Sequence, residues 1–416
     1  MFQTIRRRLD CRHEGGFSLI EVVMAMFIFA LVSTGIMYSL LSILAVSRDN
    51  RARQVATNLA AEEIDAARGV SDIVNDLVPT TSVRELNGDR YVITRTVEWV
   101  SDAASSLSCG ASPAGEKLQY KKVNVEVTWD NMRSNRPARA DTVINPTERV
   151  NDPTKGTILM SVISSDGTGT QGVAVSASPG LGSSVAPTDS LGCAFALKVN
   201  PGTYTVNLAK SGHVNEKNEP TASRSGVVIT PGSTTSLAFE YDEAARYSIA
   251  VPALAGPGAA ESPSPHKFSF INTYRTHVAT GSSHNMYPRS AGYTVVAGDA
   301  ATCPAADPAN WPASPDGSLV PAPLEPVPSQ PGDSVSVDVP MATVTVTGAS
   351  GWQLRAVSRA GAAGGDCSSP VTLTFPAGGG GARTLALPYG AWDISRATWP
   401  YNAVTSVTLD PRVPAP

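Results

Sequence analysis

The chain of 416 residues is too long for one ordinary hydrophobic core, so its length predicts two or three domains beyond any membrane helix. Its net charge of −4 argues against a nucleic-acid partner, which would need a local basic stripe. The one candidate stripe, Arg133, Arg136 and Arg139, is better interpreted as a solvated loop.

A basic, polar head precedes a long apolar run at the N-terminus. The head carries four arginines, and residues 17–46 form a nearly uninterrupted apolar segment whose only charge is Glu21. Because about 20 apolar residues span a bilayer as a helix, this segment predicts a transmembrane helix over residues 17–47. Three arginines follow it closely, so the distribution of positive charge alone does not fix the orientation of the helix.

The string EGGFSLIEVV at residues 14–23 resembles the processing signal of type IV prepilins and pseudopilins. In that family a short basic leader ending in Gly is cut on the cytoplasmic side and the apolar segment is kept. The resemblance implies that prepilin peptidase removes residues 1–16 by cleaving after Gly16. Phe17 would then become the N-methylated first residue of the mature chain. Ordinary secretory signals differ, because they are cut after the apolar region and lose it.

Glu21 is the most unusual residue of the apolar segment. A carboxylate in a spanning helix costs about 2.5 to 3.5 kcal/mol near the centre and less near an interface, so Glu21 is expected to have a partner. The resemblance implies that the partner is the new α-amine of Phe17 on a neighbouring subunit, a contact that would set the register between apolar helices. The alternative is a plain signal anchor whose Glu21 reaches the headgroups.

Residues 48–150 predict a compact head that continues from this helix. Apolar residues recur at steps of three, four or seven from Val55 to Leu77, which predicts that the helix extends to about residue 78, before Pro79. Period-two alternation then predicts half-buried strands at residues 91–100, 122–129 and, more weakly, 141–144.

Trp99 and Trp129 lie in the two stronger of these strands, and we expect both to anchor the core of the head. A long helix packed on such a meander resembles the globular head of a minor pilin. The strings RTVEWV and VEVTW look particularly like the minor-pilin group that modifies type IV pili.

Residues 151–245 change in character to short β runs separated by Gly, Ser and Pro, a spacing typical of a β-sandwich. The runs lie at residues 156–162, 172–177, 189–197 and 201–206. Their order, with a Gly-x-Phe-like step followed by PGTYTV, resembles the carboxypeptidase regulatory-like or transthyretin-like module. That resemblance implies a small seven-stranded Greek-key domain.

Residues 246–416 predict a second, degenerate β-domain. Residues 384–394 parallel residues 195–206, with Gly390 and Trp392 in the places of Gly202 and Tyr204. Residues 342–348 resemble the opening strand of the first copy. Two further β runs, at residues 247–251 and 267–271, belong either to this copy or to a separate sheet.

Two stretches of this second β-domain have a biased composition. The Pro-rich insert at residues 303–331 predicts extended chain, and the four glycines at 378–381 predict a mobile turn. The glycines precede a strand and lack a following Lys-Ser or Lys-Thr, so they are no phosphate cradle.

Four of the five cysteines lie beyond the leader, in a part of the chain expected outside the cytoplasm, where disulfides form. We expect Cys303 to pair with Cys367, because both fall within one predicted domain. Cys109 and Cys193 form a weaker candidate for a bridge between domains. No Cys-x-x-Cys pair is present, so neither a zinc site nor a redox site is predicted.

Catalytic patterns are not evident in the sequence, so we expect no enzymatic activity, no cofactor and no metal. The four histidines beyond the leader have no metal-site spacing, and neither a Gly-x-Ser-x-Gly elbow nor a zinc-peptidase motif is present. These histidines are His213, His266, His277 and His284.

The predicted fold class is α+β: a long N-terminal transmembrane and amphipathic helix on a small antiparallel sheet, followed by all-β Greek-key sandwich modules. The expected function is that of a minor type IV pilin or pilin-like subunit, assembled into or at the tip of a surface filament. Its partners would be the cytoplasmic membrane, prepilin peptidase, other pilins and the pilus assembly machinery. Its C-terminal domains would lie outside the cytoplasm and could serve in adhesion or in a tip complex.

Three alternatives remain open at this point. The nearest is a pseudopilin of a type II secretion or DNA-uptake system. An enzyme tethered to the surface by the membrane helix belongs to a different class, and activity of the soluble part would reveal it. An unprocessed cell-surface scaffold would differ in its mature N-terminus.

Overall fold

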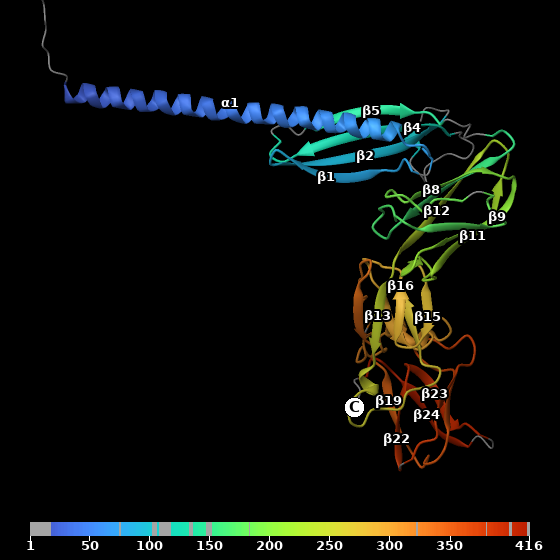
Figure 1. Ribbon diagram of the computed structural model, residues 1–416. Helices are drawn as coiled ribbons and strands as arrows, with labels where there is room; N and C mark the ends of the chain where they lie inside the picture. The colour runs from blue at the N-terminus through green and yellow to red at the C-terminus, as the bar shows by residue number, and fades with distance from the viewer. Residues whose placement is uncertain are drawn as a thin grey trace, which may run out of the picture. The chain divides into compact units, whose positions relative to one another are not determined.

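The computed structural model describes residues 18–74, 76–101, 106–107, 118–132, 136–146, 152–182, 184–321, 323–379, 381–398 and 402–413. The chain divides into two compact units, Met1–Glu98 with Tyr120–Asn145, and Trp99–Gln119 with Pro146–Pro416. One long N-terminal helix belongs to the first unit, and the second unit consists mostly of β-strands (Figure 1). The expected α+β class is confirmed.

Helix α1 runs without a break from Leu19 to Arg68. The predicted end near residue 78 is wrong, because the helix stops at Gly69, whose N–H donates to the carbonyls of Asp65 and Ala66. Just beyond, the Asp72 carboxylate accepts a hydrogen bond from the N–H of Val74 at 3.0 Å, a local bond that competes with helical pairing.

The apolar stripe beyond the helix end is nevertheless buried. Ile73 and Leu77 lie in the same core as the helix face, with Leu77 fully buried. The sequence pattern therefore predicted the burial of these residues correctly and their helical conformation wrongly.

The head sheet has the strand order β1-β2-β4-β5, with the short β3 beside β2. The strands are β1 Thr80–Leu86, β2 Asp89–Ser101, β3 Ser106–Leu107, β4 Leu118–Trp129 and β5 Ala138–Ile144. The three predicted strands correspond to β2, β4 and β5. Strand β1 was missed because all seven of its residues are exposed, so it shows no alternation. Asn87 and Gly88, both with positive φ, form the two-residue turn between β1 and β2 and are the signal that marks this hairpin.

A stripe of mostly small residues on the second half of α1 packs on this sheet: Ala52, Ala56, Leu59, Ala60, Ile64 and Ala67. The sheet contributes larger side chains to the same core, among them Tyr91, Ile93, Val123, Val125 and Trp129. Alanines let the helix approach the sheet closely, and the larger strand residues fill the remaining volume.

The first module, residues 156–243, contains seven strands in two sheets, ordered β10-β12-β6-β8 and β11-β9-β7. The strands are β6 Gly156–Ile163, β7 Ala174–Ser178, β8 Cys193–Val199, β9 Gly202–Ala209, β10 His213–Asn215, β11 Thr221–Ile229 and β12 Thr234–Glu243. Apolar residues of both sheets share one core that includes Ile158, Val206 and Tyr241. Strand β12 runs parallel to β6, and the other pairs are antiparallel.

The middle module, residues 245–339, has two three-stranded sheets, β16-β13-β18 and β15-β14-β17, around a core of its own. Its strands are β13 Ala245–Ala250, β14 Lys267–Ile271, β15 Thr276–Thr280, β16 Ser283–Met286, β17 Thr294–Ala297 and β18 Ser334–Asp338. Between β13 and β14 lies the 3₁₀ turn η1, Pro252–Leu254.

The third module, residues 342–409, pairs β19 with β22 and orders the other strands β21-β20-β23-β24 around a separate core. The strands are β19 Ala342–Thr347, β20 Leu354–Ser358, β21 Thr372–Phe375, β22 Ala382–Leu387, β23 Gly390–Arg396 and β24 Ala403–Leu409. Residues 246–416 thus hold two modules instead of the single expected β-domain. The runs at 247–251 and 267–271 belong to sheets of the middle module.

The three modules share a pairing scheme. The opening strand pairs antiparallel with a later strand in each of them: β6 with β8, β13 with β16, and β19 with β22. In the first two modules the opening strand also pairs parallel with the last strand. Tyr204 and Trp392 correspond in detail, since each ring donates a hydrogen bond of 2.9 Å to a carbonyl four residues back, that of Asn200 or Pro388.

The Pro-rich insert is more ordered than the extended chain that its composition predicts. It contains two 3₁₀ turns, η2 Pro304–Ala306 and η3 Pro308–Asn310. Trp311 is buried behind them and donates from its indole Nε1 to the carbonyl of Ala305 at 2.8 Å. Beyond the insert, the Arg412 guanidinium lies 5.3 Å from the centre of the Trp311 ring.

Candidate functional site

The first half of α1 carries the strongest candidate for a functional surface. Between Leu19 and Val46 its large apolar side chains are exposed, and Leu19 alone is 83% exposed. A helix of 50 residues is about 75 Å long, more than twice the roughly 30 Å of a bilayer's hydrocarbon core. This helix is long and apolar enough to cross a membrane in its first half, and that stretch is not buried within the protein.

Glu21 lies in the first turn of this helix, where the helix dipole stabilises a negative charge. Ser18 is the N-cap residue, and its carbonyl accepts hydrogen bonds from the N–H groups of Glu21 at 2.9 Å and Val22 at 3.2 Å. The spacing Ser-x-x-Glu is that of a capping box, yet the Ser18 side chain forms no cap hydrogen bond.

The Ser18 and Glu21 side chains therefore do not form a capping box. The Glu21 carboxylate makes no hydrogen bond or ion pair with any residue that the structure describes. Gly16 and Phe17, the predicted cleavage site and mature N-terminus, lie outside the described residues. A carboxylate presented on an otherwise apolar helix end can accept a cationic group from outside the chain.

A group of polar contacts marks where α1 leaves its exposed half and meets the head. Arg48 pairs with Asp89 at 2.5 Å, and Trp129 donates from its indole to Asp49 at 3.3 Å. The Arg53 guanidinium lies 5.2 Å from the centre of the Trp129 ring. These contacts place the boundary close to residue 47, where the sequence predicts the end of the membrane helix.

Buried charges fix the second half of α1 and the segment after it to the head sheet. Arg95 pairs with Glu63 at 2.8 Å, with the two side chains only 10% and 20% exposed, and also donates to the carbonyl of Val78. The buried Lys121 ammonium donates to the carbonyls of Val74 and Leu77 at 3.1 and 2.9 Å. These bonds compensate the burial of each charge and hold the segment that replaces the predicted last helical turns.

The arginine group considered for nucleic acid forms no basic stripe among the described residues. Arg133 lies outside them, and Arg139 pairs with Glu126 at 3.5 Å and Asp141 at 3.4 Å. The Arg136 carbonyl accepts a bond from Arg53, which places it beside α1.

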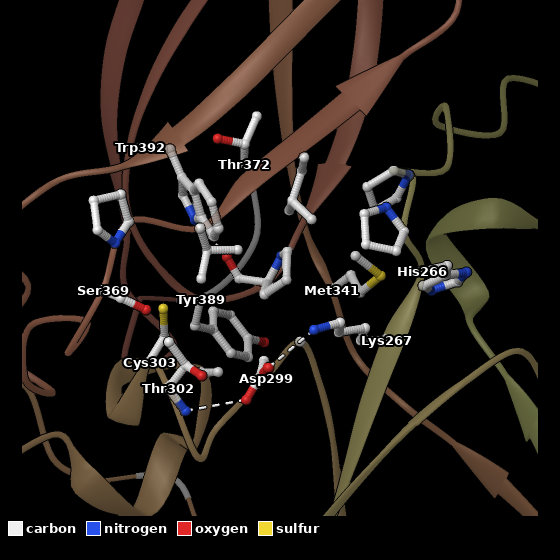
Figure 2. A pocket seen from close by; sticks show the side chains of 18 residues that line it. His266, Lys267, Asp299, Thr302, Cys303, Met341, Ser369, Thr372, Tyr389 and Trp392 are labelled. Carbon is white, nitrogen blue, oxygen red and sulfur yellow. Dashed lines mark hydrogen bonds and ion pairs between the residues drawn. The ribbon is translucent and has the colours of Figure 1, made fainter.

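A cavity of about 300 Å³ lies between the middle and third modules. Figure 2 shows Asp299 in it, held between the Lys267 ammonium at 3.1 Å and the N–H of Thr302 at 3.0 Å. Burial alone would raise the pKa of Asp299, but the bonds from Lys267 and Thr302 outweigh it and lower that pKa below its ordinary value. The charge of Lys267 is thus already neutralised inside the cavity.

Histidine and cysteine positions give no metal site in the described part of the chain, where no three His, Cys, Asp or Glu side chains are grouped to hold an ion. His266 lines the cavity, and burial lowers its pKa, as it does for His213 and His277. Their imidazoles are therefore expected to be neutral at pH 7.

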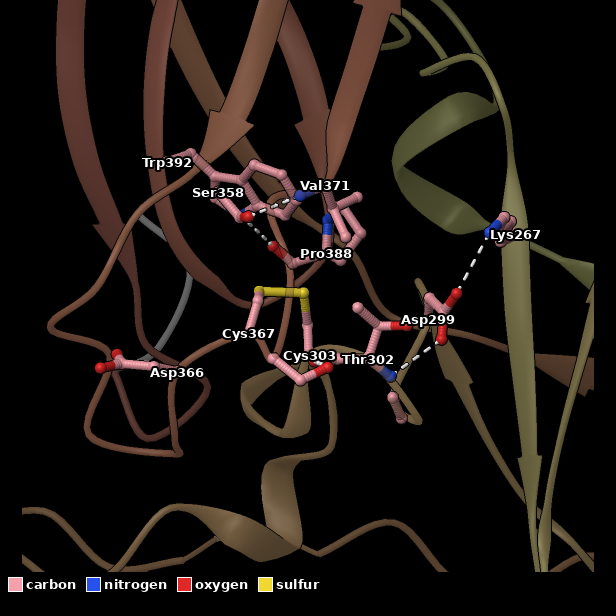
Figure 3. Close-up of a disulfide and its surroundings, with 12 residues drawn as sticks. Lys267, Asp299, Thr302, Cys303, Ser358, Asp366, Cys367, Val371, Pro388 and Trp392 are labelled. Atoms are coloured by element: carbon pink, nitrogen blue, oxygen red, sulfur yellow. Dashed lines mark hydrogen bonds and ion pairs between the residues drawn. A yellow bond between two sulfur atoms is a disulfide. The ribbon is translucent and has the colours of Figure 1, made fainter.

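Cys303 and Cys367 form a disulfide, the pair that the sequence favours (Figure 3). The bond joins the loop after β17 to the loop between β20 and β21, so it links two modules, not two parts of one. Cys109 lies outside the described residues, and so does its expected bridge to Cys193. Arg383 of the third module reinforces the link through two hydrogen bonds to the Glu261 carboxylate, at 2.8 and 2.5 Å.

Comparison with known protein families identifies a motif at the N-terminus. The prokaryotic N-terminal methylation motif matches residues 11–37, which include Gly16, Phe17 and Glu21. The chain therefore carries a type IV prepilin-like N-terminus. No curated protein sequence matches the chain.

Solved structures similar to this chain include three bacterial proteins, all at low identity. The Bacillus anthracis TIE protein is 12% identical, covering 82% of this chain and 73% of its own, with a TM-score of 0.22. A streptococcal ancillary pilin is 10% identical, covering 54% and 76%, with a TM-score of 0.19. The major pilin subunit of Bacillus cereus is 10% identical, covering 62% and 96%, with a TM-score of 0.17. TM-scores this low do not establish a shared fold.

Proposed function

We propose that this chain is a minor type IV pilin or pilin-like subunit that prepilin peptidase cleaves after Gly16. The observation that carries the proposal is the methylation motif at residues 11–37 together with the exposed apolar first half of α1. The one carboxylate of that half, Glu21, has no partner among the described residues. In this function the helix first lies in the cytoplasmic membrane and then packs against the helices of neighbouring subunits. Glu21 pairs with the N-methylated amine of Phe17 on a neighbour.

The β-modules bear on the position of the subunit in a filament. Three modules follow the head, so the subunit is bulky compared with one that ends after its head sheet. Such a subunit suits a filament tip or a low-abundance position, with its modules outside the cytoplasm in a non-enzymatic, adhesive or tip-complex role. The seven strands of the first module support its interpretation as a carboxypeptidase regulatory-like module.

The mature N-terminus tests the proposal directly. Mass spectrometry of protein from cells with a working prepilin peptidase should find a chain that begins at an N-methylated Phe17. Gly16→Val should block cleavage by adding a branched side chain next to the scissile bond, whereas the control Gly15→Ala should still be cleaved. An intact Met1 terminus on the unaltered protein would exclude the proposal.

The pseudopilin alternative needs a second measurement. Purified surface filaments that contain the subunit in small amounts would support a pilus. Secretion or DNA uptake that fails without the subunit, in cells whose pili are normal, would favour the pseudopilin.

A further inference from the structure

A groove of about 620 Å³ lies where the first module meets the middle module. Its polar and aromatic lining comes from both modules and includes Ser164, Ser165, Glu240, Tyr274, Tyr287 and Arg289. These residues form no local pattern in the sequence, because they come from several loops that are far apart in the chain.

Arg289 is the unusual residue of the groove. Its guanidinium carbon lies 4.9 Å from the centre of the Tyr274 ring and 5.2 Å from that of Tyr287. Its Nε is buried and has no hydrogen-bond partner among the described residues, although the guanidinium also hydrogen-bonds to the Tyr293 side chain. No described carboxylate lies within ion-pair distance of the guanidinium. The Arg289 side chain is only partly buried and has no carboxylate partner among the described residues, so a carboxylate from outside the chain can bind its remaining N–H groups.

The two loops that carry the site are fixed by hydrogen bonds. The N–H of Arg289 donates to the Ser329 hydroxyl at 3.3 Å, and the N–H of Ser329 donates back to the Arg289 carbonyl at 3.0 Å. In the turn between β14 and β15, the Asn272 side chain accepts from the N–H of Tyr274 at 2.8 Å. The Tyr274 side chain itself is 78% exposed, which is unusual for a large aromatic residue. Such fixed loops lower the entropy cost of binding.

The chemistry of the lining selects a class of ligand. An exposed tyrosine face packs against the apolar C–H face of a sugar ring, while a planar guanidinium binds a carboxylate through two parallel hydrogen bonds. The exposed Glu240 carboxylate and the serines can bond sugar hydroxyls, and Glu240 disfavours ligands that are anionic on every side. An acidic peptide offers the carboxylate but no flat C–H face for Tyr274.

We propose that this groove binds a carboxylated saccharide, with Arg289 on the carboxylate and Tyr274 against the sugar ring. Binding itself does not rest on the proposed pilin function, although it would supply the adhesive contact suggested there. The Arg289 and Tyr274 side chains both belong to the middle module, so the central contact is made within one module.

The test uses the full mature chain in detergent micelles, with trigalacturonic acid as the probe and its methyl ester as the neutral counterpart. Isothermal titration should show the acid binding at least roughly tenfold more tightly than the ester, the factor expected for one charge-assisted contact. Arg289→Gln should remove that preference. Tyr274→Ala, at an exposed position, should weaken both ligands by roughly fivefold, because both stack through the same ring.

Arg246→Gln is the matched control, because Arg246 is an exposed arginine on β13 of the same module and lies outside the groove. It should leave both affinities unchanged. Equal binding of acid and ester, or an unchanged preference in Arg289→Gln with native circular dichroism, would overturn the proposal. Tighter binding of a glutamate-rich peptide than of the saccharide would overturn the ligand class. A processed, filament-forming chain that fails these tests would leave the proposed function standing.

Discussion

The two halves of α1 belong to one unbroken helix but differ in what their side chains contact. The first half, to residue 47, presents large apolar side chains to its surroundings and carries Glu21, whose carboxylate has no partner among the described residues. The second half turns a stripe of mostly alanine to the head sheet and carries Glu63, paired with Arg95. The second half is packed and paired within the chain, whereas the apolar side chains of the first half are exposed in the described structure.

This difference shows how one secondary structure serves two environments. Small residues appear where the helix approaches the sheet, and large apolar residues appear where its side chains are exposed. Charge follows the same division, because a buried carboxylate is stable only with a partner. Substitutions in the two halves should therefore affect different properties of the protein.

The largest expected effect comes from Glu21→Gln in the first half. In the proposed function, removing the charge removes the pairing with a neighbour's amine, so incorporation into filaments should fall at least roughly tenfold, which corresponds to about 1.4 kcal/mol. Quantitative immunoblots of sheared filaments against membrane fractions measure this. Cleavage after Gly16 and the unfolding of the head should not change. Normal incorporation of the variant would mean that the carboxylate does not direct assembly.

The second effect concerns Glu63→Gln in the other half. This change leaves the mostly buried Arg95 guanidinium without its carboxylate, so the free energy of unfolding should fall by about 2 to 3 kcal/mol. Denaturant titration in detergent, followed by tryptophan fluorescence, measures the loss. The neighbouring pair Glu62 and Arg84 is the matched control, since both side chains are more than half exposed. Glu62→Gln should lower the free energy of unfolding by less than about 1 kcal/mol. Equal losses in the two variants would show that the buried pair stabilises the head no more than the exposed pair.

The smallest effect is expected from enlarging a small residue. Ala60 is fully buried against the sheet, so Ala60→Leu should overpack the core and destabilise the head by about 1 to 2 kcal/mol. Ala30→Leu, at an exposed position in the first half, should leave the same unfolding curve unchanged. A comparable shift in both variants would show that the first half also packs within the chain.

The sequence predicted local features better than long-range ones. The helical first half of α1, the strands β2, β4 and β5, and the parallel between Tyr204 and Trp392 follow from patterns within a few residues. The helix end was missed because apolar spacing up to Leu77 reports burial, and an irregular segment can fill the same core. The number of modules depends on pairs such as β13 with β18, whose partners are distant in the chain. The groove around Arg289 could not be found for the same reason, because only the fold brings its loops together.

The Cys303–Cys367 disulfide also sets how far the chain can be drawn out under load. It closes a loop with a sequence separation of 64 residues. A fully extended chain spans at most about 3.3 to 3.6 Å per residue. The disulfide therefore prevents the enclosed residues from adding roughly 220 Å to the length of the unfolded chain. If force is applied between α1 and the C-terminal module, a subunit with this disulfide can therefore extend by that much less than a reduced subunit.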